Sequence, residues 1–485
     1  MRKVYIRELK PYSLATLSEL FGYSTSQTKT LVGDLMTRGI VRYRTGANSD
    51  PEETDAEGAA PDELYQFRFV GLVMMSDTLI VSYPKYFRNR IPTDDELMLI
   101  LRILKRDAGV AVVTSLENGE ATANDKLPVM LALLDLYSEY GEYSNHVEGL
   151  ELNGSGSIDW NRTINGHLPI LSNGRPIYIE CETRRTFRDE SDFIARLHRA
   201  ILTECSRTFH EAGIDKLLSL DEVLLSDEEV EDFGDAETLS WRLERERMTQ
   251  FVDWKLLTLD LLERYLLVRE SEVRSDEMRA LGTTSFYNVW ENACKVAFGD
   301  ALKKTLGSLG FTIENKWDVD KKLAEIIPQP QWERWLGDRF AKREGTDTLI
   351  PDTVTIAESS DGERLFCIYD AKHYVPSAKG KMKHQPGLES VTKQFLYQSA
   401  YRRFIKAHKF DRVVNAFLVP GTVDEPKLMA RVSFPYVIAE EEEPFDNFIY
   451  MWMLPAHDVF KAYLDGGVLG DAIAQTASMV MIGNS

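Results

Sequence analysis

Short helical and strand patterns alternate over residues 1–90. Ser13 precedes an apolar face of helical spacing that ends at Gly22, and a second helical pattern begins at Ser24 or Thr25. Apolar residues then predict three strands, over residues 40–44, 67–73 and 79–83. We expect a winged-helix-like module followed by a small β domain, a unit that contacts either DNA or a protein partner.

The middle of the chain, residues 91–275, is predicted to be mainly helical. Its last part, residues 237–272, places apolar side chains at near-helical spacing among many charges, which is typical of a stalk. Over residues 276–485 the order changes to helix, hairpin, helix and strands, which is typical of an α/β restriction-endonuclease-like core. We therefore expect an α+β multidomain protein with three parts, divided after residues 90 and 275.

The most informative pattern lies in this C-terminal part. The apolar run 365–369 ends in Asp370 and, two residues on, Lys372. Because side chains alternate along a strand, these two point to the same face. Asp352 begins an earlier apolar run, and a tight loop that ends in Gly362 connects the two runs. Counting outward from this loop carries Asp352 to a position opposite Asp370.

Two carboxylates and an ammonium at one end of a rigid strand suit a divalent metal. Mg²⁺ prefers oxygen ligands and keeps several waters, so one or two carboxylates with a substrate phosphate can hold it. The expected ligands are Asp352 and Asp370. Lys372 would orient an attacking water or stabilise the charge that develops on phosphorus. The simpler alternative is an ordinary polar end of a buried strand.

Helical patterns lie on both sides of this hairpin. One begins after Ser285, whose hydroxyl we expect to cap it. It contains Glu291, which is predicted to be partly buried and is either functional or a structural partner of Lys295. The other pattern covers residues 389–407 and places four polar residues on one face, namely Gln394, Tyr397, Gln398 and Tyr401. This helix either contributes to the site or only covers the sheet.

The order of these features resembles the PD-(D/E)xK nuclease superfamily, with Pro-Asp at 351–352 and Asp-Ala-Lys at 370–372. The resemblance implies catalytic roles for the two aspartates and the lysine, with Glu291 as a further acid that binds metal. In RecB-like branches a glutamine and a tyrosine follow on the next helix at four-residue spacing. Here each glutamine precedes its tyrosine by three residues, and we favour Gln394 as the counterpart.

Wider runs resemble the LlaJI-type restriction endonucleases, which are relatives of McrC, the nuclease subunit of McrBC systems. The runs that carry this resemblance are 67–73, 79–87, 156–164, 370–374, 385–387 and 392–397. The resemblance implies a Mg²⁺-dependent endodeoxyribonuclease subunit of a restriction or phage-defence system, activated by a McrB-like AAA+ GTPase that the N-terminal region engages. The chain contains no Gly-x-x-x-x-Gly-Lys-Ser/Thr sequence, so another chain would hydrolyse the nucleotide. The alternatives are a stand-alone RecB-like DNA repair nuclease and a non-catalytic winged-helix adaptor.

The net charge of −20 opposes binding to DNA, which is itself an anion. Acidic residues are concentrated over residues 50–63, 221–237 and 440–443. Beside the predicted metal site, in contrast, basic residues gather in a loop and on the next helix: Lys379, Lys381, Lys383, Lys393 and Arg402. We expect these residues to contact the DNA backbone, with a partner that helps to load the DNA. The alternative is a solvated loop.

Cysteine usage and the absence of long apolar runs indicate the compartment. The four cysteines, Cys181, Cys205, Cys294 and Cys367, have no close pairing in sequence. They are interpreted as reduced core thiols without a zinc site. Met1-Arg2-Lys3 is not followed by an apolar signal core, and no run approaches membrane-spanning length. We expect a cytoplasmic protein that does not contact membranes.

Overall fold

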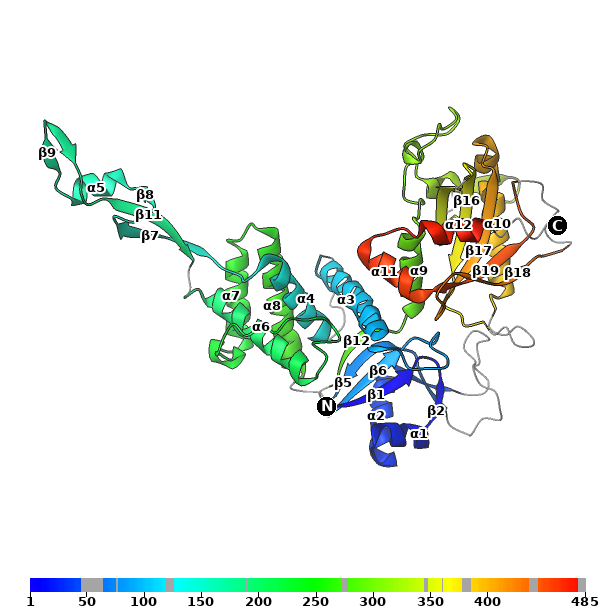
Figure 1. Ribbon diagram of the computed structural model, residues 1–485, viewed down its shortest axis with the longest axis horizontal. Coiled ribbons are helices and arrows are strands. Elements are labelled where there is room, and N and C mark those ends of the chain that lie inside the picture. The colour runs from blue at the N-terminus through cyan, green and yellow to red at the C-terminus, as the bar shows by residue number, and fades with distance from the viewer. Residues whose placement is uncertain are drawn as a thin grey trace. The chain divides into compact units, whose positions relative to one another are not determined.

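The computed structural model describes residues 1–44, 64–75, 77–117, 126–188, 191–272, 278–343, 348–359, 361–376, 385–435 and 444–478. Helices and strands are mixed throughout these residues, which confirms the expected α+β class (Figure 1). The chain forms two compact units. The first contains Met1 and residues 74–77 and 108–281, and the second contains residues 2–73, 78–107 and 282–485.

The first unit contains a group of packed helices: α4 (Lys126–Tyr140), α6 (Phe193–Glu211), α7 (Ala236–Arg247) and α8 (Asp253–Glu272). Helix α4 packs against α6 and α8, and α7 packs against α8. The expected stalk over residues 237–272 is therefore two helices rather than one. Between them, Gln250 Oε1 accepts hydrogen bonds from the backbone N–H groups of Phe251 at 3.1 Å and Val252 at 3.2 Å.

An arm extends from the helices of this unit (Figure 1). Its elements are β7 (His146–Leu152), β8 (Ser157–Ile158), α5 (Trp160–Gly166), β9 (Ile170–Ser172), β10 (Arg175–Ile177) and β11 (Glu182–Arg188). Strand β11 pairs antiparallel with β7 and β8, and β9 pairs with β10. The mainly helical pattern predicted for residues 91–275 did not reveal these strands.

The second unit begins with small sheets and two helices. Its elements are β1 (Arg2–Arg7), β2 (Pro11–Ser13), α1 (Leu14–Phe21), α2 (Thr25–Thr37), β3 (Val41–Arg44), β4 (Leu64–Phe67), β5 (Val70–Met74), β6 (Thr78–Tyr83) and the start of α3 (Asp94–Glu117). The predicted helix ends are confirmed. The Ser13 hydroxyl accepts the backbone N–H of Thr16 at 3.1 Å, and Gly22 ends α1 with a φ of 68°. Ser24 caps α2 in a reciprocal arrangement with Gln27.

The rest of this unit surrounds a five-stranded sheet with the order β15-β16-β17-β19-β18. The strands are β15 (Thr353–Glu358), β16 (Arg364–Ala371), β17 (Arg412–Gly421), β18 (Lys427–Val432) and β19 (Ile449–Pro455). Strands β16, β17 and β19 are parallel, whereas β15 and β18 pair antiparallel at the two edges. The parallel strands are almost continuously apolar because both faces of the sheet are covered.

The remaining described elements of this part are β12 (Arg279–Thr283), where the chain passes from the first unit into the second, the hairpin strands β13 (Trp332–Trp335) and β14 (Phe340–Arg343), two short 3-10 helices (Leu306–Ser308 and Leu323–Ile326) and four α-helices. The helices are α9 (Phe286–Ala297), α10 (Leu388–Ala407), α11 (Ala456–Asp465) and α12 (Gly470–Ser478). Among the residues that the structure describes, no helix is both long and apolar enough to cross a bilayer.

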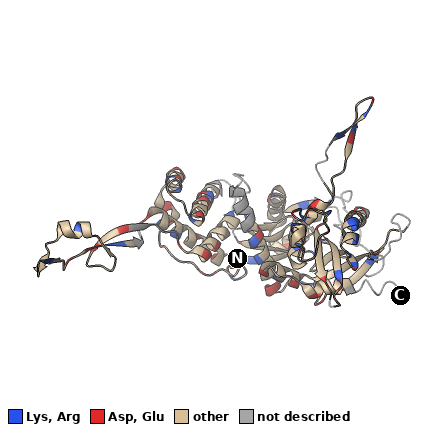
Figure 2. Ribbon diagram, turned by 90° about the horizontal axis from the view of Figure 1, so that it is seen from above, with Lys and Arg blue, Asp and Glu red and all other residues tan. Residues whose placement is uncertain are grey.

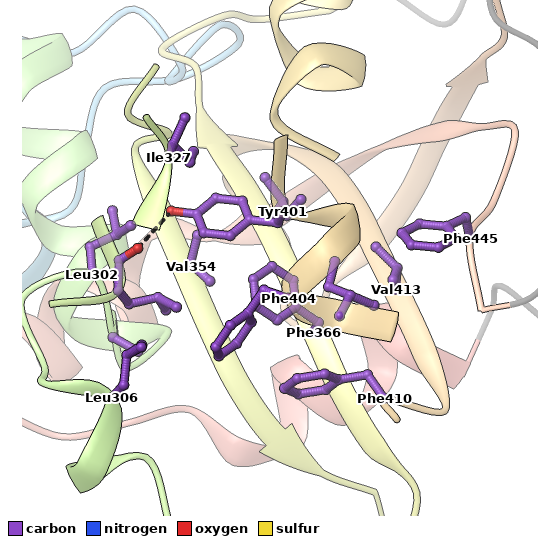
Figure 3. Close-up of a cluster of buried hydrophobic side chains, with 14 residues drawn as sticks. Leu302, Leu306, Ile327, Val354, Phe366, Tyr401, Phe404, Phe410, Val413 and Phe445 are labelled. Atoms are coloured by element: carbon purple, nitrogen blue, oxygen red, sulfur yellow. Dashed lines mark hydrogen bonds between the residues drawn. The ribbon is translucent and has the colours of Figure 1, made fainter. Parts of the chain in front are cut away.

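One face of the sheet is held to α10 by a cluster of buried aromatic and aliphatic side chains (Figure 3). The ring of Phe366 on β16 lies 5.2 Å from the ring of Tyr401 and 5.2 Å from that of Phe410. The Tyr401 hydroxyl donates to the Leu323 carbonyl at 3.4 Å, so its polar end is satisfied within the core. This packing makes β16 a rigid support for the residues at its carboxyl end.

Candidate active site

The hairpin β15–β16 has the register that the sequence predicts. Gly362 adopts a φ of 80°, and the backbone N–H of Ser359 donates to the Glu363 carbonyl at 2.9 Å. Thr353 pairs with Tyr369 at the far end of the ladder. The next pair outward is Asp352 and Asp370, so the structure brings these two carboxylates together across the hairpin.

Asp352 is attached to the peptide that follows the second acid. Its Oδ2 accepts the backbone N–H of Ala371 at 3.1 Å. The pKa of Asp352 is raised to about 7, first by burial and then by the hydrogen bond and the like charge of the Asp370 carboxylate. The Lys372 ammonium and the bond from Ala371 oppose this effect. Ionising both acids is therefore unfavourable until a cation arrives.

Lys372 extends the line of β16 beyond its last strand residue. Its backbone N–H donates to the Leu418 carbonyl of β17 at 2.9 Å. Its ammonium lies 3.0 Å from Oδ1 and 2.9 Å from Oδ2 of Asp370, which is only 6% exposed. The lysine is thus held in place by backbone pairing at one end and by a charge-assisted contact at the other.

The donor set fits a divalent cation that retains water. Two acids and one lysine leave the site short of positive charge, and the pKa of Asp352 is raised mainly by burial and secondarily by the neighbouring Asp370. Within the described residues, no group of three or more Asp, Glu, His or Cys side chains surrounds a possible metal position. A closed protein cage is therefore absent there, but Mg²⁺ needs only one or two carboxylates beside water and phosphate oxygens.

Glu291 lies near this site but has a partner of its own. Its carboxylate is 2.6 Å from the ammonium of Lys295, one turn along α9. Burial raises the pKa of the Cys294 thiol well above its usual range, and the charges of Asp352 and Glu291 add to the effect. The Cys294 thiol is therefore close to both Asp352 and Glu291. Glu291 does not form one three-residue cluster with the two aspartates.

Helix α9 is positioned by a tryptophan rather than by its cap. Ser285 precedes the helix but makes no capping bond through its side chain, so that expectation is wrong. Instead, the buried indole of Trp290 donates to the Leu418 carbonyl at 3.1 Å. The same carbonyl accepts the backbone N–H of Lys372, so α9 and the strand end meet at one residue.

The polar face of α10 divides into two roles. Gln398 is structural: its amide donates to the Asp446 carbonyl at 3.1 Å and its oxygen accepts from Asn415 at 3.2 Å. Gln394 donates to the Ala416 carbonyl at 3.3 Å, and its buried Oε1 has no hydrogen-bond partner among the described residues. Burying an amide oxygen without a hydrogen bond costs free energy. This cost favours Gln394 over Gln398 as the glutamine that binds a ligand.

Tyr397 on this helix is affected directly by the charges of the two aspartates. The pKa of Tyr397 is raised to about 12. Burial is the largest cause, and the negative charges of Asp352 and Asp370 also raise it. Tyr401, by contrast, lies in the hydrophobic core. The sequence placed both tyrosines on one face but did not single out Tyr397. The sequence signal that could have singled out Tyr397 was its position three residues after Gln394, the favoured glutamine.

The basic residues proposed to contact DNA are described in part. Lys379, Lys381 and Lys383 lie outside the described residues. Lys393 is half-exposed and lies 2.5 Å from Glu389, one turn earlier on α10. The guanidinium of Arg402 lies 4.7 Å from the centre of the Phe445 ring. Figure 2 shows acidic and basic residues interspersed along the chain.

The segment after Lys372 is held by the N-terminal part of the same unit. The guanidinium of Arg88 donates to the Val375 carbonyl. His373 is buried, with Nδ1 3.9 Å from Oε2 of Glu8 and its ring 5.2 Å from that of Phe286. Burial lowers the pKa of His373 well below its usual range, so the ring is neutral.

The family of the chain follows from comparison with known proteins. The family model described as LlaJI restriction endonuclease matches residues 69–441, a span that includes strands β5 and β6 of the N-terminal part and the facing aspartates. The chain therefore belongs to the LlaJI restriction endonuclease family. The resemblance inferred from the sequence runs is confirmed.

One relative and two solved structures are among the proteins similar to this chain. The chain is 26% identical over 396 residues to the type II restriction enzyme BsuMI component YdjA of Bacillus subtilis (strain 168), which covers 77% of this chain and 79% of that protein. A solved assembly of Thermococcus gammatolerans McrB AAA+ hexamers with bound McrC contains a chain that is 13% identical, with a TM-score of 0.32, covering 96% of this chain and 99% of that one. A second structure, the McrBC complex of the same organism, gives 16% identity and a TM-score of 0.22, covering 55% of this chain and 79% of that one.

Proposed function

We propose that this chain is the Mg²⁺-dependent endodeoxyribonuclease subunit of a restriction system. The observation that carries the proposal is the pair Asp352 and Asp370, which face each other across a tight hairpin with Lys372 beside them. Membership of a restriction endonuclease family supports phosphodiester hydrolysis as the reaction. The PD-(D/E)xK core over residues 276–485 is part of this proposal.

Each residue then has a stated task. Asp352 and Asp370 would hold Mg²⁺, which supplies Lewis acidity and a more acidic water when it is bound. Lys372, fixed by Asp370 and by the backbone of β17, stabilises the negative charge that develops on the phosphoryl oxygens. Gln394 and Glu291 are supporting members, through an unpaired amide oxygen and a nearby carboxylate respectively.

We further propose that a McrB-like AAA+ GTPase activates the chain. The relative YdjA is described as one component of a restriction enzyme, which suggests a multi-subunit assembly. The arm of the first unit supports a protein contact because it exposes large apolar side chains, such as Leu168 at 96%, Leu171 at 73% and Ile179 at 66%. The winged-helix-like module at residues 1–90 is a second surface for the partner or for DNA.

Cleavage of circular plasmid DNA tests the proposal. Wild type, Asp370→Ala and the control Asp361→Ala are incubated with Mg²⁺, alone and with the proposed McrB-like AAA+ partner plus GTP or ATP. Asp361 is exposed in the turn of the same hairpin, so its loss leaves the site intact. We expect wild type and Asp361→Ala to cut the plasmid when the partner and nucleotide are present. Asp370→Ala should not cut it under any of these conditions.

Other outcomes favour the competing functions. Digestion of linear DNA from its ends by the isolated chain, without action on circles, favours a RecB-like repair nuclease. No cutting by any combination, with the complex still assembled, favours a non-catalytic adaptor.

A further inference from the structure

A two-stranded ribbon precedes the proposed active site in the sequence, and its residues 332–340 are exposed. Strands β13 and β14 pair antiparallel, with Trp332 opposite Arg343 and Trp335 opposite Phe340. At the tip the backbone N–H of Leu336 donates to the Arg339 carbonyl at 2.8 Å, around Gly337 with a φ of 100°. A two-residue turn with glycine first is a favoured hairpin connection, so the ribbon is well formed locally.

The ribbon exposes large aromatic side chains. Trp332 is 67% exposed, Trp335 56% and Phe340 63%. The rings of Trp335 and Phe340 lie 4.9 Å apart across the strands and support each other on one face. Such side chains are normally buried, so three of them exposed on one ribbon indicate a surface that another molecule covers.

The charge of the ribbon is opposite to that of the chain as a whole. Residues 332–343 contain four basic and two acidic side chains, whereas the chain carries a net charge of −20. Arg334, Arg339 and Lys342 are exposed. Aromatic and basic side chains together favour nucleic acid over an acidic or purely apolar partner, because they match its phosphates and its bases.

The base of the ribbon is tied to the protein close to the aspartates. The Thr348 hydroxyl donates to the carbonyls of Ile327 at 3.1 Å and Pro328 at 3.2 Å, which brings both ends of the ribbon together. Ile327 is buried in the core cluster against the sheet. Asp352 follows Thr348 by four residues, which span at most about 14 Å. The segment that leads out of the ribbon is therefore also the segment that leads into the proposed site.

We propose that the β13–β14 ribbon is a DNA-contacting element that lies in a groove of duplex DNA beside the phosphodiester to be cut. The major groove is about 12 Å wide and admits a two-stranded ribbon. Arg334 and Arg339 then reach phosphates, and the tryptophans contact the groove walls. The inference rests on the proposed function for its substrate, but it concerns binding rather than cleavage.

Binding of a fluorescent duplex to the full chain, followed by anisotropy at several salt concentrations with Ca²⁺ in place of Mg²⁺, tests this. The variants are Arg334→Ala with Arg339→Ala, and Trp332→Ala with Trp335→Ala. The matched control is Trp241→Ala with Arg245→Ala, an exposed tryptophan with an arginine over its ring on α7. Melting temperatures equal to that of wild type show that each variant is folded.

We expect both ribbon variants to weaken duplex binding by about tenfold or more, and the arginine pair to reduce the salt slope by about two. The control should bind as wild type does. Equal affinity of wild type and ribbon variants, or no duplex binding by wild type at low salt, overturns the proposal. Loss of AAA+ partner binding with unchanged DNA affinity also overturns it and assigns the ribbon to a protein.

These outcomes are separate from those of the proposed function. If Asp370→Ala leaves cleavage unchanged while the ribbon variants lose DNA, the ribbon inference stands and the nuclease assignment fails. If cleavage requires Asp370 but the ribbon variants bind duplex DNA as wild type does, the nuclease assignment stands and the ribbon inference fails.

Discussion

The carboxylate of Asp352 accepts the backbone N–H of Ala371, at 3.1 Å, from the strand opposite. Ala371 stands between Asp370 and Lys372, so one hydrogen bond ties the first acid to the peptide that carries the second acid and the lysine. The proposed site is therefore a single unit of hairpin backbone. Changes to its charges and changes to its geometry can be tested separately.

Removing the charge of Asp352 should stabilise the protein in the absence of metal. The folded pKa of about 7 lies above the ordinary value of 3.8, so this group favours folding below about pH 4 and the benefit is lost as pH rises through 7. We expect Asp352→Asn to melt about 2–5 °C higher than wild type at pH 8 in EDTA, and about equally at pH 4. Thermal melts by differential scanning fluorimetry measure this.

The control for that experiment is Asp361→Asn in the exposed turn, which should melt as wild type does at both pH values. Millimolar Mg²⁺ should raise the melting temperature of wild type and leave that of Asp352→Asn unchanged. Equal melting of Asp352→Asn and wild type at pH 8 in EDTA would contradict the assigned repulsion.

Neutralising Lys372 should remove cleavage without removing binding. Its ammonium contacts Asp370 at 2.9 Å and is the positive group next to the expected phosphate. We expect Lys372→Met to lower the cleavage rate by about a hundredfold or more, a loss typical of one charge-stabilising donor. Lys393→Met, which removes a half-exposed lysine on α10, should lower it by less than about tenfold. Plasmid cleavage rates measure this difference, and similar losses in both variants would argue for a general charge effect.

The two tyrosines of α10 should have separable effects. The hydroxyl of Tyr397 lies in the field of both aspartates, so Tyr397→Phe should slow cleavage by about tenfold with an unchanged melting temperature. Tyr401 donates to the Leu323 carbonyl in the core, so Tyr401→Phe should cost about 1 kcal/mol of unfolding free energy and leave the cleavage rate unchanged. Urea unfolding and plasmid cleavage, measured on both variants, show which tyrosine acts at the site and which one stabilises the fold. The opposite assignment of effects would place Tyr401 at the site.

The helical unit should be sensitive to acid through His198. This ring is buried and accepts the backbone N–H of Tyr143 at 3.0 Å, and burial lowers the pKa of His198 to about 3. Its stabilising contribution is therefore complete above about pH 6.5 and is lost as pH falls toward 3, because the unfolded state binds the proton first. We expect His198→Gln to flatten the decline of melting temperature between pH 6.5 and 4.

The control is His210→Gln, which removes a largely exposed ring at the end of the same helix and should keep the wild-type pH dependence. Parallel declines for wild type and His198→Gln would show that another group controls the acid response.

Local patterns were sufficient for the hairpin that holds the proposed site. A tight turn with Gly362 at positive φ sets the pairing, and a period of two residues then places Asp352 opposite Asp370 and Lys372 on the face of Asp370. The ends of α1 were also evident, because Ser13 and Gly22 satisfy backbone groups within a few residues. These features depend on neighbours in sequence, so the sequence determines them.

Only the tertiary structure decided which polar residues meet. Tyr397 and Tyr401 share one helix face by spacing, but packing on the sheet directs one toward the aspartates and the other into the core. Glu291 forms an ion pair with Lys295 on its own helix, one of the two roles that the helix spacing left open. The sequence did not predict the strands of the arm and of the β13–β14 ribbon. Their apolar residues are largely exposed and do not follow the alternation of a half-buried strand. Side-chain contacts between distant segments depend on how the elements pack, and the periodicity of one segment carries no information about that.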